Sequence, residues 1–350
     1  MRGRVTEASG AYEIRAATRE HLDAISELAR HLDTVNLPDD PAVIEQLLLA
    51  SEQSFARTIE NPARREYVFV LWDLERDRAA GTSMVIGQLG RRDAPYIYFD
   101  VRREEKYSAT LDRHFVHRIL ATCYSYEGPT EIGGLVVAPE YRRRRERLGT
   151  LISYVRFLFI AQRRRDFRDE LLAELLPPLE PDGRSLLWEA VGRRFTGLPY
   201  READRLSRRN KEFIRGLFPD EIYATLLSPR AQRVIGEVGS QTLGVAKLLE
   251  RIGFRYAQRV DPFDGGPHFV APTEGVSLVA AARACDLRVA PPPAPPGAVP
   301  ALIAEDLPSA PHYRAVRGHL DPDGRALLAP RDAERMGLES GAVVWAVPLD

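Results

Sequence analysis

The sequence predicts an α/β fold, of the α+β kind, built from more than one compact unit. Of its 350 residues, 44% are hydrophobic and 28% are charged, which is typical of an ordinary globular protein and not of a disordered one. Short runs of β-branched and aromatic residues alternate with stretches of helical periodicity. At this length a single hydrophobic core is close to its practical limit, so we expect two units and a smaller appendage.

The first part of the chain is predicted to open with a strand, two helices and a hairpin. Residues 12–16 have the pattern of a strand, and Thr18 is a residue type that caps a following helix. The apolar positions within residues 43–49 predict the second helix. Residues 67–72 and 79–86 are rich in residues that favour strands and are separated by a charged turn, so we expect a hairpin.

Two more strands and a long apolar helix are predicted before residue 165. The strands cover residues 96–101 and 132–137, and the helix runs through residues 151–160. The second part of the chain repeats this alternation less clearly. Its predicted elements are a strand at 171–175, a helix from Leu187 to Phe195, helices around Phe213 and Val234, a helix at 246–252 that ends at Gly253, and a strand at 254–260.

A proline-rich stretch separates the last part of the chain from the rest. Residues 289–300 contain six prolines, which is typical of an extended connector. Beyond it, short apolar runs and glycine turns predict a small β-rich module. We therefore predict an N-terminal unit (1–165), a second α/β half that completes a cleft (166–288), the connector (289–300) and a C-terminal module (301–350).

Composition excludes several classes of protein. The chain has 49 basic and 50 acidic side chains, so no overall field attracts nucleic acid or an anionic membrane. Cys123 and Cys285 lie far apart without metal-ligand spacing, so we expect neither a disulfide framework nor a metal. No apolar run reaches the roughly 18 residues of a membrane span, and no signal-peptide core is present, so we expect a cytoplasmic protein.

The segment from Glu131 to Thr150 carries the clearest chemical signal. An apolar strand passes through a turn at Pro139 into an arginine-rich loop, and a long helix follows. Free N–H groups at a helix N-terminus, together with nearby guanidinium groups, favour a phosphate or diphosphate. A solvated arginine run is the alternative, but cations at a helix N-terminus are mildly unfavourable unless an anion lies nearby.

This strand, turn, loop and helix, with Gly149 at the end of the loop, resembles motif A of the GNAT acyl-CoA N-acyltransferases. Other short segments narrow the resemblance to the arginine N-succinyltransferase family, whose motifs they match in the same order over nearly the whole chain. They are Tyr67-Val-Phe-Val-Leu, Arg156-Phe-Leu-Phe-Ile-Ala, Trp188-Glu, Asn210-Lys211, Gly253-Phe-Arg-Tyr and Phe263-Asp-Gly-Gly-Pro. The resemblance implies a GNAT-type fold and an N-acyltransferase that transfers succinyl from succinyl-CoA to the α-amino group of L-arginine, in arginine degradation.

The resemblance also implies partners and site residues. The acceptor is L-arginine or L-ornithine, the chain forms an oligomer with itself or with a related subunit, and neither metal, nucleic acid nor membrane takes part. Glu131 and Glu174 match family glutamates, so either can orient or deprotonate the acceptor amine. The expected contacts to succinyl-CoA begin at Leu135, where a splayed or bulged strand offers backbone groups, and the diphosphate lies at the following loop. The residues concerned are Leu135, Val136, Val137, Arg142, Arg143, Gly149 and Thr150.

The chain departs from the family pattern at three places. The family's proton-donor histidine is Gly239 here, and a family arginine suited to a carboxylate is Leu176. Residues 144–148 replace a glycine-rich loop and keep none of its glycines. These departures leave an alternative open: an altered or non-catalytic relative that binds acyl-CoA, or a transferase for a different amine. Nucleic-acid binding through the arginine run ranks last, because no aromatic residues are interleaved within it.

Three histidines are further candidates for functional residues. His114 and His117 are three residues apart, a spacing that places them on one face of a predicted helix, where they could bind a metal. No third ligand is near in sequence, and paired surface histidines are more common. His268 follows the Gly-Gly-Pro motif and could reach the acceptor, although a loop histidine is more often a bystander.

Overall fold

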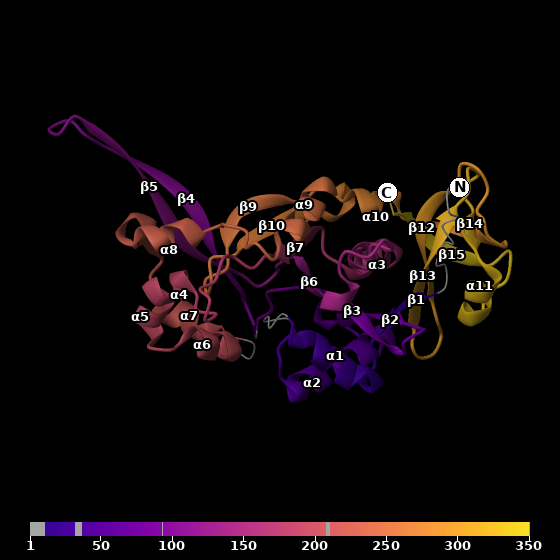
Figure 1. Cartoon of the computed structure of the whole chain (residues 1–350). Coiled ribbons are helices and arrows are strands. Elements are labelled where there is room, and N and C mark those ends of the chain that lie inside the picture. Colours follow the sequence, from indigo (N-terminus) through magenta and orange to yellow (C-terminus); the bar gives the residue numbers. More distant parts are fainter. Residues whose placement is uncertain (1–10, 32–36, 93, 208–210, 350) are drawn as a thin grey trace. The chain divides into compact units, whose positions relative to one another are not determined.

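The computed structural model describes residues 11–31, 37–92, 94–207 and 211–349. The chain forms two compact units, each assembled from segments that are distant in sequence (Figure 1). Unit 1 contains Met1–Gly87, Ile132–Phe167 and Glu274–Asp350, and unit 2 contains Gln88–Glu131 and Arg168–Thr273. Among the described residues, none of the helices combines the length and the apolar character that crossing a membrane requires.

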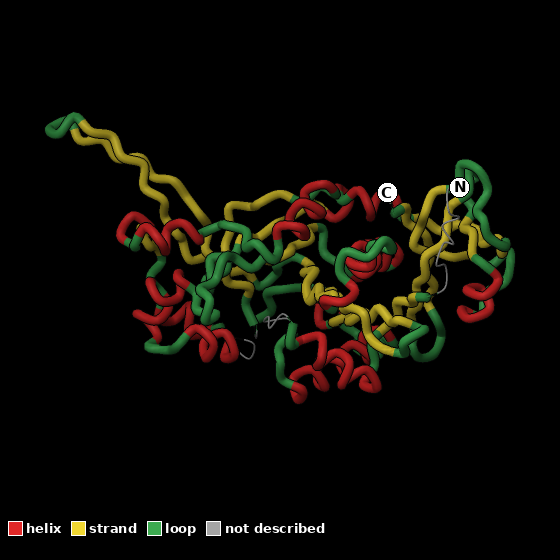
Figure 2. The backbone as a smooth tube through the Cα atoms, viewed as in Figure 1, coloured by secondary structure: helices red, strands yellow, loops and turns green. Residues whose placement is uncertain are grey.

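Unit 1 is a mixed α/β structure (Figure 2). Its strands lie in the order β12-β15-β11-β14-β13-β1-β2-β3-β6. Their bounds are β1 Tyr12–Ala16, β2 Glu66–Asp73, β3 Arg78–Ile86, β6 Thr130–Val137, β11 Arg283–Val289, β12 Val299–Asp306, β13 Tyr313–Leu320, β14 Ala326–Leu328 and β15 Val343–Pro348. The helices are α1 Leu22–Ala29, α2 Pro41–Phe55, α3 Leu148–Gln162, α10 Ser277–Ala281 and α11 Pro330–Met336.

The core of unit 1 forms around helix α3, which is apolar on nearly every side. Phe159 of α3 lies within 4.7–5.3 Å, between ring centroids, of Phe55, Tyr67, Phe69 and Tyr313. The Ser83 hydroxyl donates to the Ile152 carbonyl at 2.7 Å and so fixes α3 to β3. A helix that is apolar all round must be enclosed, which is why the sequence places it between the sheet and the C-terminal strands.

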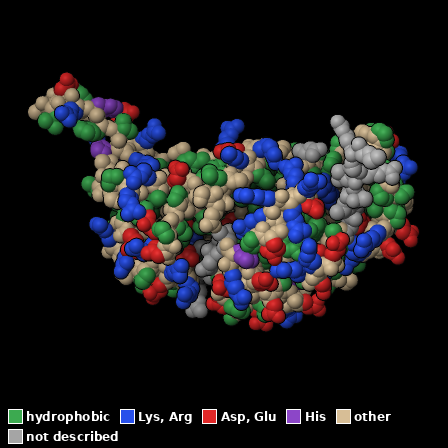
Figure 3. Space-filling model, in the orientation of Figure 1, with side chains coloured by type: hydrophobic (Ala, Val, Ile, Leu, Met, Phe, Trp, Pro, Cys, Tyr) green, Lys and Arg blue, Asp and Glu red, His purple; other side chains and the backbone are tan. Residues whose placement is uncertain are grey.

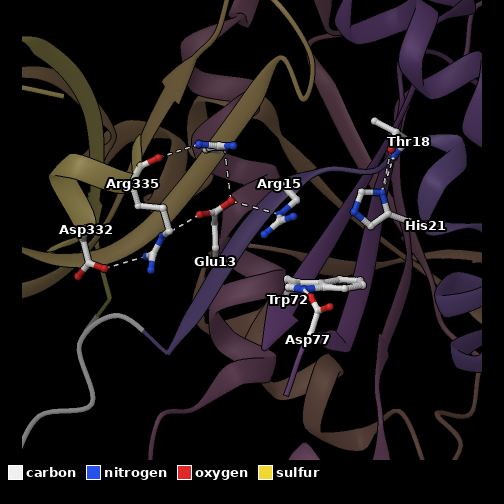
Figure 4. A network of polar contacts seen from close by, with 9 residues as sticks. Glu13, Arg15, Thr18, His21, Trp72, Asp77, Asp332 and Arg335 are labelled. Atoms are coloured by element: carbon white, nitrogen blue, oxygen red, sulfur yellow. Dashed lines mark hydrogen bonds and ion pairs between the residues drawn. The ribbon is translucent and has the colours of Figure 1, made fainter. Parts of the chain in front are cut away.

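The first and last parts of the chain join within unit 1. Ile14 of β1 pairs with Leu71 of β2 on one side and with Ala315 of β13 on the other. Glu13, only 1% exposed, forms ion pairs with Arg335 at 3.0 Å and with Arg15 at 3.2 Å (Figure 4). The C-terminal strands therefore complete the sheet that β1 begins.

Unit 2 has a second sheet region, in the order β7-β10-β9-β4-β5-β8, with helices beside it. The strands are β4 Tyr96–Ser108, β5 Arg113–Ser125, β7 Glu170–Glu174, β8 Glu221–Tyr223, β9 Arg255–Val260 and β10 Pro267–Pro272. The helices are α4 Leu186–Ala190, α5 Gly192–Thr196, α6 Tyr200–Ser207, α7 Glu212–Leu217, α8 Pro229–Val234 and α9 Leu243–Arg251. Trp188 stacks on Phe263 at 5.0 Å between ring centroids and anchors the core of this unit.

Most predicted elements are confirmed, with bounds that differ by a few residues. The helix predicted for His114 and His117 is wrong, because both lie in β5, opposite Tyr107 and Glu104 of β4. The distal part of this hairpin is exposed on both faces (Figure 1), so its sequence lacks the apolar alternation that marks a half-buried strand. Strands β8, β10, β11, β12 and β13 are further elements that the sequence analysis does not predict.

The predicted connector, residues 289–300, joins β11 to β12, and the residues after it contribute β12–β15 to unit 1. The predicted division into four segments stays a prediction. On the face seen in Figure 3, basic and acidic side chains are intermingled, in keeping with the near balance of 49 basic and 50 acidic residues.

Candidate active site

Strand β6 is irregular at its centre. Gly134 has a φ of +56°, and a Cβ there would lie 2.8 Å from the Met84 Sδ. Thr130 and Glu131 pair with β7 in unit 2, whereas the later residues of the strand have β3 as their neighbour in unit 1. A glycine with positive φ inside a strand turns backbone groups out of the regular ladder. Leu135 and Val137 are half-buried just after this point, and Val136 is buried.

The arginine loop follows β6 directly. The Arg142 Nε donates to the Val137 carbonyl at 2.8 Å, and Arg142 and Arg143 are both exposed. Arg144 has a different role, because its guanidinium lies 4.6 Å from the Tyr141 ring centroid and donates to the Tyr12 hydroxyl at 3.0 Å. The loop therefore presents Arg142 and Arg143 to solvent, while Arg144 holds the loop against the core.

Helix α3 begins at the end of this loop without a side chain that caps it. Arg147, its N-cap residue, has a φ of +53°, and Arg143 has a φ of +58°, so two arginines adopt the left-handed conformation that usually favours glycine. Gly149 and Thr150 are half-buried in the first turn, and a Cβ on Gly149 would meet only Val137, at 3.7 Å. Two arginines of this loop thus adopt backbone conformations that glycine would adopt with less strain.

In unit 2, one face of the sheet gathers polar side chains. Glu174 of β7 lies directly opposite His268 of β10, and residues opposite each other in an antiparallel pair share a face. His268 is 0% exposed, its Nδ1 lies 2.7 Å from the Tyr96 hydroxyl, and its Nε2 lies 3.5 Å from the Glu174 Oε1. Glu131 pairs in register with Leu172, two residues before Glu174, so both predicted glutamates lie on neighbouring strands of unit 2.

Burial shifts the pKa values of these groups. It lowers the pKa of His268 to about 3, so the imidazole is neutral at physiological pH. It raises the pKa of Glu174 and of Asp261, although the nearby Lys211 ammonium opposes both shifts. Burial lowers the pKa of Lys211, but Glu174 and Asp261 outweigh this effect and the net shift is upward. Among the described residues, the cluster is therefore rich in carboxylates, and the Lys211 ammonium partly offsets their negative charge.

A backbone irregularity lies beside His268. The β9–β10 register shifts between Pro267 and Phe269, and Gln258 in β9 has a φ of +56°. The preceding turn depends on two glycines: Gly265 has a φ of +82°, and a Cβ on Gly266 would lie 2.3 Å from the Leu175 carbonyl oxygen. Bulges and left-handed residues of this kind are common beside functional sites, where they redirect a side chain.

Gly239 lies against the segment that follows Glu174. Its N–H donates to the Leu176 carbonyl at 2.8 Å, and a Cβ at this position would lie 2.8 Å from both the Leu176 and the Pro177 carbonyl oxygens. The adjoining Leu175 N–H donates to the Pro267 carbonyl, next to His268. Gly239, where the resemblance implies the family histidine, is thus bonded to the segment that follows Glu174, and a Cβ there would collide with two backbone carbonyl oxygens.

The predicted site residues fall into both units. Glu131 and Glu174 belong to unit 2, and the residues predicted to bind acyl-CoA belong to unit 1. Tyr96, Lys211 and Asp261 are functional candidates that the sequence did not indicate, and for His268 the sequence favoured a bystander in a loop. The position of His268 directly after the Phe263-Asp-Gly-Gly-Pro motif was the available signal.

One set of described residues has the spacing of metal ligands, although the sequence analysis expects no metal. Glu174, Asp261 and His268 each offer a ligand atom, and these atoms lie within 4.8 Å of one another. Lys211 already supplies positive charge to both carboxylates.

Comparison with known proteins identifies the family. The model of the family described as arginine N-succinyltransferase beta subunit matches residues 12–278. The chain belongs to the arginine N-succinyltransferase family. The family resemblance stated from the sequence, and the α/β fold of an acyl-CoA N-acyltransferase that it implies, are confirmed. As a family of acyltransferases, the arginine N-succinyltransferases use an acyl-CoA co-substrate.

Individual arginine N-succinyltransferases match from end to end. The chain is 33% identical over 347 residues to the arginine N-succinyltransferase subunit beta of Pseudomonas aeruginosa, covering 96% of this chain and 98% of the relative. It is 32% identical over 351 residues to an arginine N-succinyltransferase of Yersinia pestis, covering 96% and 97%. The solved structure of arginine/ornithine succinyltransferase subunit AI from Pseudomonas aeruginosa superposes with a TM-score of 0.82 at 28% identity, covering 97% and 99%.

Proposed function

We propose that this protein transfers the succinyl group of succinyl-CoA to the α-amino group of L-arginine, in arginine degradation. The main support for the proposal is sequence similarity to enzymes named for this reaction. One of them is 33% identical over 96% of the chain. L-ornithine is a second acceptor to test, because a solved relative is named for both amino acids.

The donor binds to unit 1 in this proposal. Arg142 and Arg143 contact the diphosphate of CoA together with the first-turn N–H groups of α3, around Gly149 and Thr150. The exposure of both guanidinium groups and the uncapped start of α3 support these roles. The backbone of Leu135, Val136 and Val137 receives the pantetheine and thioester, since Gly134 interrupts the regular strand immediately before them.

The acceptor binds to unit 2. An arginine or ornithine side chain is a cation, and the carboxylates of Glu174, Asp261 and Asp264 lie close enough together to affect one another's pKa. Burial raises the pKa of each of them. A cationic ligand stabilises their ionised forms, so this cluster suits a basic amino acid.

Glu174 is the proton acceptor in this proposal, and Glu131 orients the amine. The α-ammonium group gives a proton to Glu174, and the neutral nitrogen attacks the thioester carbonyl. The C–N bond forms, the C–S bond breaks, and the second nitrogen proton goes to the CoA thiolate. His268, held by the Tyr96 hydroxyl, packs beside the Glu174 carboxylate, with its Nε2 3.5 Å from the Oε1. A thiol with a pKa of about 8.5 is a tolerable leaving group, so transfer proceeds without a histidine at Gly239.

The subunit names of two relatives also support assembly with a second subunit, either another copy of this chain or a related chain. Light scattering after gel filtration of the purified protein measures this directly. A monomer at all micromolar concentrations contradicts self-assembly.

Thiol release from succinyl-CoA, with and without L-arginine or L-ornithine, tests the reaction. We expect release that depends on an amino acid and a product of the mass of N-succinylarginine. Calorimetric titration of succinyl-CoA runs beside it. Tight binding without release would favour the altered-relative alternative, for which the closed backbone at Gly239 is the specific supporting observation. Absence of both binding and release would contradict the proposal.

A further inference from the structure

Three arginines are buried among the described residues, and all of them lie in unit 1. Arg65 is 7% exposed and donates to Asp166 at 2.9 Å. Arg163 is 8% exposed and donates to both carboxylate oxygens of Asp306, at 3.2 and 2.9 Å. Buried guanidinium groups are normally paired in this way, because an isolated buried charge is costly.

Arg156 differs from the other two. It is the most enclosed of the three, at 2% exposure, and its hydrogen bonds to described residues all go to neutral groups. The Nε donates to the Ser153 carbonyl at 3.1 Å, the Nη2 to the Ser153 hydroxyl at 2.8 Å, and the Nη1 to the Gly133 carbonyl at 3.5 Å. Burial lowers its pKa to about 9, which still leaves the group charged at neutral pH. Within the part of the chain that the structure describes, this buried cation therefore has no anionic partner.

The location of Arg156 indicates which ligand could supply the missing anion. The side chain projects from α3 toward Gly133 of β6, one residue before the left-handed Gly134 and two before Leu135. These are the two elements to which the acyl-CoA is assigned. A planar guanidinium with five N–H donors binds a carboxylate through two parallel hydrogen bonds, and the three contacts described leave two donors for a ligand.

We propose that Arg156 binds the terminal carboxylate of the donor's acyl group and so makes this enzyme selective for CoA thioesters of dicarboxylic acids. The inference rests on the proposed binding of acyl-CoA at β6 and α3. Ser153 holds the guanidinium in place before the ligand arrives, which reduces the entropy lost on binding. An acyl chain that ends in a methyl group leaves the cation unpaired in a dry site, and this penalty provides the discrimination.

The test compares succinyl-CoA with butyryl-CoA, which has the same chain length and lacks the terminal carboxylate. Dissociation constants are measured by calorimetry on the full-length wild type and on R156M and R156K, with CoA alone as the reference. We expect the wild type to prefer succinyl-CoA by on the order of 10²-fold. R156M should lose that preference, while its affinity for CoA stays within about threefold of the wild type. R156K should keep part of the preference, because lysine retains the positive charge but lacks the paired N–H donors of the guanidinium.

Thermal unfolding separates this role from a structural one. Replacing a buried unpaired charge with an apolar side chain is often neutral or stabilising, so ligand-free R156M should melt at or above the wild-type temperature. Succinyl-CoA should raise the melting temperature of R156M no more than butyryl-CoA does. A matched control is R142M, at the proposed diphosphate site, which should weaken both thioesters equally and leave their ratio unchanged.

The outcomes distinguish this inference from the proposed function. A wild type that binds CoA and both thioesters with equal affinity would overturn the role of Arg156 and leave acyl-CoA binding intact. An R156M variant that keeps the wild-type preference, or that melts well below the wild type, would also overturn it. A wild type that binds neither CoA nor its thioesters would overturn the proposed function, and the inference with it.

Discussion

The two units bury side chains of opposite charge. Unit 1 encloses Arg156 without an anion and presents further arginines beside the start of α3. Unit 2 gathers Glu174, Asp261 and Asp264, with Lys211 near the first two, and burial raises the pKa of each carboxyl group. The chain as a whole has a net charge of -1, so its overall composition does not reveal these two local concentrations of charge. Local burial, and not total charge, is therefore what supports the proposed placement of an anionic donor at one unit and a cationic acceptor at the other.

The largest expected effect tests the acidic side of this comparison. E174Q removes the proposed proton acceptor and should lower kcat/KM by about 10²- to 10⁴-fold, the usual share of a general base. The affinity for succinyl-CoA, measured by calorimetry, should not change. E170Q, on the same strand and face and in contact with Arg259 at 3.4 Å, is the matched control and should stay within about threefold of wild type.

The pH profile extends this test. A base must be deprotonated to act, so kcat/KM of the wild type should fall as the pH drops through the Glu174 pKa, which burial raises above its ordinary value. A profile of E174Q with the same acidic limb as wild type would assign that limb to another group.

The basic side of the comparison is tested at the arginine loop. The double variant R142A/R143A should weaken succinyl-CoA binding by about tenfold or more, because charge-assisted contacts to the diphosphate are lost. The difference from wild type should shrink at high salt, since both side chains are exposed. R145A, in the same loop, serves as the control. A rise in the KM for L-arginine instead of succinyl-CoA would contradict the assignment of this loop to the donor.

The position of the absent family histidine provides a stability test. G239A and G239H each place a Cβ 2.8 Å from two carbonyl oxygens, so we expect a loss of about 1–3 kcal/mol in the free energy of unfolding. G239H should not increase the rate. The control G244A adds a Cβ that meets nothing within 4 Å, in the first turn of α9, and should be neutral or stabilising in urea unfolding. A faster G239H enzyme would show that the backbone can open to accept the family residue.

A smaller effect concerns the pH dependence of stability. The folded-state pKa of His268 is lowered to about 3, so from pH 6.5 downward the unfolded chain binds a proton that the folded chain does not. Stability is therefore lost as the pH falls, by up to about 1.4 kcal/mol per pH unit. H268L should show a shallower loss between pH 6.5 and 4. Glu174, Asp261 and Asp264 act in the opposite direction, but both proteins contain them. The exposed H114L is the control, and equal slopes in wild type and H268L would contradict this account.

The smallest expected effect lies at the left-handed arginines. R143G relieves a φ of +58° and should raise the free energy of unfolding by up to about 1 kcal/mol, because glycine adopts this conformation without steric cost. R145G, whose backbone has no such strain, should instead lower it through the added entropy of the unfolded chain. Chemical denaturation of both variants at one pH gives the comparison. A destabilised R143G would show that its side chain contributes more than its backbone strain costs.

The sequence was sufficient to predict β6, the turn at Pro139 and α3, because long apolar runs and a proline define them locally. The family resemblance implied an irregular strand at Leu135, but the positive φ of Gly134 could not be predicted, since a glycine inside a strand does not reveal its φ. The acidic cluster was also out of reach, because Tyr96, Glu174 and His268 lie far apart in the chain and meet only through the pairing of β7 with β10 and the neighbouring strands. The β4–β5 hairpin was missed in part because its exposed distal residues have no buried face to impose alternation.

The pairing of β1 with β13, reinforced by the ion pair between Glu13 and Arg335, has a consequence for biosynthesis. Unit 2 ends at Thr273, so all of its segments are synthesised before the last part of unit 1. Strand β1 precedes all of these segments in the chain, yet its partner β13 ends only at Leu320. The nascent chain therefore keeps this edge of β1 open until residues 313–320 have been made, and the pairing of β13 is the event that covers it.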